Sequence, residues 1–69
     1  MILIPLSSTF SVKAERIVSV TQDLIHNKKV YFVQHRNDEG DINQYRANHT
    51  DLLKLCFKEN RIKIINETD

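Results

Sequence analysis

Residues 30–48 read VYFVQHR-NDEG-DINQYRAN and decide the fold. The run 30–33 consists of β-branched and aromatic residues, which favour a strand. The next four residues, 37–40, combine Asn, Asp and Gly, which is typical of a tight turn. The segment 41–48 is therefore predicted to return antiparallel to 30–36, so that the two segments form a hairpin.

The turn can be closed in two ways. A longer loop pairs Arg36 with Asp41, and a shorter one pairs Asp38 with Asp41. Both closures divide the side chains identically, because alternation along a strand has period two. One face is predicted to carry Val30, Phe32, Gln34, Asn43, Tyr45 and Ala47. The opposite face is predicted to carry Tyr31, Val33, His35, Ile42, Gln44 and Arg46.

Before this hairpin, short strands are predicted at 2–6 and 10–12, followed by a longer strand at 16–22 and a connector at 23–28. After it, apolar residues recur with a helical period over 50–59. One stripe of that helix is predicted to carry Leu52, Leu55, Cys56 and Glu59, flanked by Leu53 and Phe57. Asn60 is predicted to take the left-handed cap. A terminal strand is expected within 61–65, and residues 66–69 read as a frayed polar tail.

The chain is therefore predicted to be one small α+β domain over residues 1–69: an antiparallel β-meander, one amphipathic helix and a short C-terminal strand. A helix of about ten residues can cover only one face of such a sheet. The other face is expected to meet water or a partner. Unprotected edge strands in so small a sheet also favour sheet extension or a homodimer.

Composition excludes several classes of protein. The formal net charge of +1 argues against a strongly cationic nucleic-acid-binding tail. The apolar N-terminal run is too short for a signal peptide or a membrane helix, and the single cysteine fits a reducing compartment. We expect a cytoplasmic protein without a membrane partner. Abundant Ile, Asn and Lys, whose codons are A/T-rich, favour a bacterial or phage origin.

Residues that carry chemistry give little sign of a catalytic site. The spacing of the histidines and of the lone cysteine fits no zinc site: His26, His35, His49 and Cys56. Cys56 reads as a buried apolar filler, and the acidic residues around Gly40 read as a solvated hairpin tip. A single glycine cannot form a phosphate-binding loop. We expect a protein that is not an enzyme and has no metal or cofactor.

The leading hypothesis is a small module that binds another protein, as a bacterial or phage-encoded inhibitor, antitoxin or regulator of a host or defence complex would. The contact residues would be Tyr31, Val33, His35, Ile42, Gln44 and Arg46, since aromatic and arginine side chains dominate many interfaces. The alternative is a single-stranded RNA or DNA binder using the same face, through Lys28, Lys29, Tyr31, Arg36 and Arg46.

Overall fold

The computed structural model describes residues 2–68 and confirms the α+β class. These described residues form two sheets: a hairpin of β1 and β2, and a four-stranded sheet in the order β5-β4-β3-β6. The elements in chain order are β1 (Leu3–Pro5), β2 (Ser11–Lys13), the 3-10 helix η1 (Ala14–Arg16), β3 (Ile17–Ile25), β4 (Lys28–Arg36), β5 (Ile42–Asn48), α1 (Asp51–Glu59) and β6 (Ile64–Ile65).

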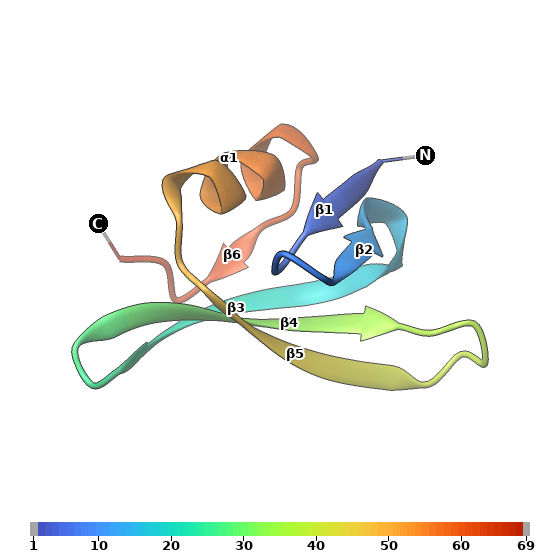
Figure 1. The fold of residues 1–69 in the computed structure, drawn as a ribbon, viewed down its shortest axis with the longest axis horizontal. Helices are drawn as coiled ribbons and strands as arrows, with labels where there is room; N and C mark the ends of the chain where they lie inside the picture. Colours follow the sequence, from blue (N-terminus) through green and yellow to red (C-terminus); the bar gives the residue numbers. More distant parts are fainter. Residues whose placement is uncertain (1, 69) are drawn as a thin grey trace.

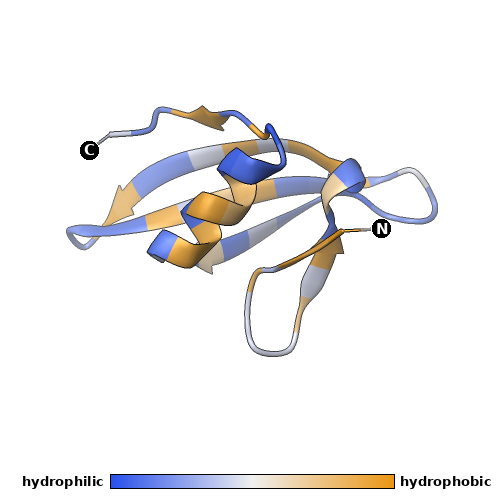
Figure 2. Ribbon diagram, turned by 90° about the horizontal axis from the view of Figure 1, so that it is seen from above, coloured by the Kyte–Doolittle hydropathy of each residue, from blue (hydrophilic) through white to orange (hydrophobic). Residues whose placement is uncertain are grey.

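All covering elements lie on one side of the four-stranded sheet. Figure 1 shows α1 and the β1-β2 hairpin together above β3, β4 and β5. Figure 2 gives the view from above, with α1 over the sheet and the N-terminal hairpin beside it. The prediction that the helix covers one face of the sheet is therefore confirmed. The hairpin extends that cover beyond the reach of a nine-residue helix.

The turn between β4 and β5 differs from both predicted closures. The backbone N–H of Asn37 donates to the carbonyl of Asp41 at 2.9 Å, so the loop contains the three residues 38–40. Gly40 has φ 89°, which the last position of such a loop requires. The side-chain oxygen of Asn37 accepts the N–H groups of Glu39 and Asp41, both at 2.9 Å.

This odd-length loop changes the register by one residue. Arg36 pairs with Ile42 and Tyr31 pairs with Ala47. The predicted division of side chains between the two faces is therefore wrong for β5 relative to β4. A slip of one residue moves every side chain of a strand to the opposite face.

The connector predicted at 23–28 is largely strand. β3 continues to Ile25 and pairs there with Lys28, so that His26 and Asn27 alone form the turn. Both turn residues have positive φ, 52° and 63°, the backbone of a two-residue turn that matches strand twist. The β3-β4 hairpin is consequently longer than the sequence pattern indicates.

Helix α1 begins after Thr50, whose hydroxyl accepts the N–H of Leu53 at 3.0 Å. The residues that α1 buries are Leu53 and Phe57, whereas Leu52 is 68% exposed. The leucines of the predicted stripe, Leu52 and Leu55, are exposed, and the helix instead buries the two residues that were predicted to flank it. The helix is rotated because burying the Phe57 ring removes more apolar area from water than burying either leucine.

Arg61, with φ 59°, takes the left-handed position that was predicted for Asn60. The N–H of Ile62 then donates to the carbonyl of Phe57 at 2.9 Å, and that of Arg61 donates to Lys58. Asn60 instead caps the helix through its side-chain amide, which donates to the carbonyl of Cys56 at 2.8 Å. Because the helix ends in this way, the terminal strand β6 contains only Ile64–Ile65 and is shorter than predicted. It runs parallel to β3.

Residues 66–68, predicted to be part of a frayed tail, are held against the domain. Glu67 accepts a 2.6 Å hydrogen bond from Lys58, and the Nζ of Lys54 lies 3.7 Å from its other oxygen. The side-chain amide of Gln22 donates to the Thr68 hydroxyl at 2.9 Å. Asp69, which was included in the predicted tail, lies outside the described residues.

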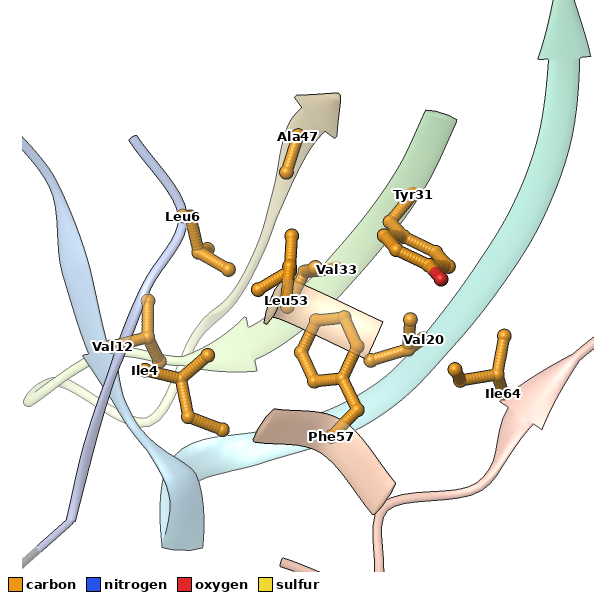
Figure 3. Packing of buried hydrophobic residues seen from close by; sticks show 10 residues of the cluster. All are labelled: Ile4, Leu6, Val12, Val20, Tyr31, Val33, Ala47, Leu53, Phe57 and Ile64. Atoms are coloured by element: carbon orange, nitrogen blue, oxygen red, sulfur yellow. The ribbon is translucent and has the colours of Figure 1, made fainter. Parts of the chain in front are cut away.

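The core fills the space between the sheet and its cover. Figure 3 shows side chains from every element except η1 converging there, with Tyr31 edge-on to Phe57 at a ring-centroid distance of 5.3 Å. The Phe10 ring stacks on Tyr45 at 4.7 Å at the margin of this core. The buried cluster consists of Ile4, Leu6, Val12, Val20, Tyr31, Val33, Ala47, Leu53, Phe57 and Ile64.

Candidate functional site

The side of the four-stranded sheet away from α1 is the candidate site, and we call it the open face. Thr21, Phe32 and Arg46 lie side by side across its three long strands, as register and alternation require. No other part of residues 2–68 lies over this side of the sheet (Figure 1). By register and alternation, the open face carries Ser19, Thr21, Asp23, Ile25, Lys28, Val30, Phe32, Gln34, Arg36, Ile42, Gln44, Arg46, Asn48 and Ile65. Val30 alone among these is fully buried, so its side chain is not available for contact.

The six predicted contact residues do not share a face. Tyr31 and Val33 are fully buried beneath the helix and hairpin, so the prediction that they are available for contact is wrong. His35 points to the same covered side and is half-buried, with its ring 5.8 Å from that of Phe10. The other three, Ile42, Gln44 and Arg46, are exposed on the open face.

Phe32 occupies the centre of the open face in the position that was predicted for Tyr31. Its strand neighbours are Thr21 on β3 and Arg46 on β5. The residue is half-buried. A partly exposed aromatic ring beside an exposed guanidinium can stack on a planar group or cover an apolar side chain.

A polar ladder crosses the three strands next to Phe32. The Ser19 hydroxyl donates to the Gln34 side-chain oxygen at 2.6 Å, and the Gln34 amide donates to the Gln44 oxygen at 3.4 Å. These bonds orient both amides across the sheet. The Gln44 amide N–H₂ at the end of the ladder is available for a ligand group.

A basic hollow of about 530 Å³ lies where the chain leaves β5, lined by Lys28, Lys29, Arg46, Asn48 and His49. The Lys29 ammonium donates to the carbonyl of Thr68 at 3.2 Å. Within residues 2–68, neither Lys28 nor Arg46 has a carboxylate at ion-pair distance. The hollow can therefore accept an anionic group.

The five residues of the predicted nucleic-acid site are divided by the structure. Lys28, Lys29 and Arg46 meet in the basic hollow. Arg36 lies at the opposite end of β4, where its guanidinium donates to the carbonyl of Gly40 at 3.3 Å. Tyr31 is buried and cannot stack on a base, so the prediction is wrong for this residue.

Sequence reasoning missed Phe32 as a surface residue and assigned it to the wrong face. The order Asn37-Asp38-Glu39-Gly40 carries the signal for the register of β5, which places the polar residues Gln44 and Arg46 on the same side as Phe32. Glycine at the last position of a three-residue hairpin loop is favoured by its positive φ. The presence of Ile65 on the open face had no such signal, since the parallel pairing of β6 depends on tertiary contacts.

Within residues 2–68, two buried side-chain oxygens lack a hydrogen-bond partner, the hydroxyl of Tyr31 and one carboxylate oxygen of Glu67. Burial raises the pKa of Tyr31, and the negative charges of Glu67 and Asp51 raise it further. The hydrogen bond from Lys58 lowers the pKa of Glu67. Tyr31 is thus a neutral core residue, without the exposure that a catalytic phenol needs.

Other chemistry-bearing residues are scattered. In residues 2–68, no group of three or more His, Cys, Asp or Glu side chains is placed to hold a metal ion. Cys56 is a half-buried free thiol on α1. No helix in the described part of the chain is long and apolar enough to cross a membrane.

Comparison with known proteins finds no matching family model, and no curated protein or solved structure is significantly similar to the chain. The function is therefore inferred from the geometry of the open face and of the basic hollow.

Proposed function

We propose that this chain is a small, non-catalytic protein-interaction module that binds a partner on the open face. Its biological role would be that of a regulator or inhibitor, as expected for a bacterial or phage protein that blocks a host or defence complex. The observation that carries the proposal is a sheet side left uncovered by residues 2–68, with Phe32 and Arg46 paired at its centre.

The chemistry of the open face supports a protein partner. Aromatic and arginine side chains contribute most to many protein interfaces, particularly near the centre of the contact. Ile42 is 54% exposed and adds apolar area beside Arg36, while Gln44 offers a directed hydrogen-bond donor. A mixed apolar and polar surface of this kind is typical of a non-obligate interface.

The test is partner capture with a matched pair of double variants. Phe32→Ala with Arg46→Ala removes the centre of the open face, whereas Leu52→Ala with Leu55→Ala removes exposed leucines from α1. Affinity purification from source cells followed by mass spectrometry is expected to lose a partner with the first variant and to keep it with the second. Circular-dichroism melts check that both variants fold. Equal capture by both variants would contradict the proposal.

A second candidate function is single-stranded nucleic-acid binding, which the basic hollow specifically favours. Lys28 and Arg46 would contact phosphates there, and Phe32 would replace Tyr31 as the ring that stacks on a base. Asp23 on the same face and the low net charge make this candidate the weaker one.

Fluorescence anisotropy with labelled oligo-dT and oligo-U separates the two candidates. A nucleic-acid binder is expected to retain these probes at low salt and to release them steeply as salt rises, because phosphate contacts displace counterions. Lys28→Ala is expected to weaken such binding, while Arg61→Ala, which is exposed at the far end of α1, serves as the control. Absence of binding at low ionic strength would eliminate this candidate.

A further inference from the structure

Strand β5 is an edge whose hydrogen-bonding groups point in a known direction. The N–H of His49 donates to the carbonyl of Lys29, and the N–H of Asn37 donates to that of Asp41. Both bonds belong to the β4-β5 register, and backbone groups alternate in direction along an antiparallel strand. Odd-numbered residues of β5 therefore bond to β4, and even-numbered residues present their N–H and C=O groups outward.

Four residues carry these outward groups: Ile42, Gln44, Arg46 and Asn48. All four are exposed, and no strand within residues 2–68 pairs with them. The pairing of β5 with β4 is regular along its whole length, without a bulge, and the strand contains no proline. Bulges and prolines are two of the devices that keep an edge from pairing with another strand.

The two ends of β5 carry opposite charge. Glu39 and Asp41 precede its first residue and are exposed, while Asp38 of the same turn is paired with Arg16 at 3.0 Å. The basic hollow lies at its last residues, with Lys28 and Arg46 lacking ion-pair partners in the described part of the chain. An antiparallel copy of β5 carries the complementary order of charges along this edge.

We propose that the partner for this edge is a second copy of the chain, paired antiparallel through β5. Only one register uses all four outward residues of both copies: Ile42 opposite Asn48, and Gln44 opposite Arg46. Continued by one residue, it places Asp41 of one copy beside His49 of the other. The turn beyond Asp41, with Glu39, then lies over the basic hollow. The contact is isologous, as a two-fold dimer requires.

Such a dimer joins two four-stranded sheets into one and makes the two open faces continuous. It also pairs backbone groups that would otherwise stay at an unprotected edge, and a chain of 69 residues gains stability from association. This inference does not depend on which ligand the open face binds.

Sedimentation equilibrium on the wild-type chain is the first test. The expected mass is twice 8.1 kDa at high concentration, falling toward 8.1 kDa on dilution. Gln44→Pro removes one outward N–H and leaves the β4-β5 bonds intact, so it is expected to give a monomer. Gln44→Thr keeps the N–H and is expected to remain a dimer. A monomeric wild type at millimolar concentration, or a dimeric Gln44→Pro, would overturn the proposal.

Two charge-reversal double variants test the register without a proline substitution. Glu39→Lys with Asp41→Lys makes both ends of β5 basic, and Lys28→Glu with Arg46→Glu makes both ends acidic. Each double variant alone is expected to weaken dimerisation about tenfold or more, since like charges then meet at both ends. Mixing the two restores opposite charges at both ends, so native mass spectrometry is expected to show the heterodimer. A mixture without heterodimer would contradict the antiparallel arrangement.

Discussion

Two consecutive residues of β4 show the difference between the covered side and the open face of the sheet. Tyr31 points toward α1, is fully buried and contacts Phe57. Phe32 points the other way, is half-buried and has Thr21 and Arg46 as its neighbours. The two side chains are similar in size and apolar character. Their different roles therefore follow from the direction in which each points, rather than from their chemistry.

In β5, the side of the sheet to which each side chain points depends on the number of residues in the loop 38–40. If the loop 38–40 were one residue longer or shorter, Arg46 and Gln44 would lie under α1 and Tyr45 and Ala47 would face the solvent. The fold would then bury a guanidinium, at a cost of several kcal/mol. The small residue Ala47 beneath the helix shows why the observed register is preferred.

The largest expected difference between the two sides is in stability. Phe57→Ala is expected to lower the free energy of unfolding by about 3–5 kcal/mol, because it leaves a cavity against Tyr31. Phe32→Ala, on the open face, is expected to cost less than about 1.5 kcal/mol, because the ring is only half-buried. Urea titrations followed by circular dichroism measure both. Equal losses would mean that the two sides are covered alike.

The rotation of α1 gives a second contrast within the covering layer. Leu53 is buried, so Leu53→Ala is expected to cost about 2–4 kcal/mol. Leu52 is exposed, and Leu52→Ala is expected to change stability by less than about 0.5 kcal/mol. The same urea titration applies, and a larger loss at Leu52 than at Leu53 would restore the orientation first predicted from the sequence.

Arg61 offers a stabilising change. Its φ of 59° is strained for a residue with a Cβ atom, so Arg61→Gly is expected to raise stability by about 1 kcal/mol. Asn60→Gly is the control, because Asn60 has φ −96° and its amide caps the helix. That control is expected to lower the melting temperature while Arg61→Gly raises it. A fall for Arg61→Gly would show that its side chain matters more than its backbone.

The smallest effect concerns the C-terminal segment that is held to α1. Lys58 keeps the pKa of Glu67 below the usual 4.5, so the folded state binds this proton less readily than the unfolded state. The contribution of Glu67 to stability is therefore present above that value and is lost as the pH falls through the lower, folded-state pKa. In urea titrations at a series of pH values, the free energy of unfolding of Glu67→Gln is expected to fall less on acidification than that of the wild type. An identical pH dependence in both proteins would mean that the Glu67 contact does not contribute to the loss of stability at low pH.

The α+β class, the order of most elements and the single covered face could all be predicted, because they depend on alternation, turn residues and helix length. The identity of the open-face residues could not, because it depends on loop parity at Gly40 and on the competition between Phe57 and two leucines. The contacts that keep residues 66–68 against the domain, and those that form the basic hollow, join segments that are far apart in the sequence. Local sequence patterns carry no signal for such contacts.

Selective labelling of aromatic rings and a soluble paramagnetic agent test the division of β4 most directly. NMR should show the ring signals of Phe32 strongly broadened by the agent and those of Tyr31 unaffected. Broadening of Tyr31 with protection of Phe32 would contradict the account and would return the recognition surface to the opposite set of side chains.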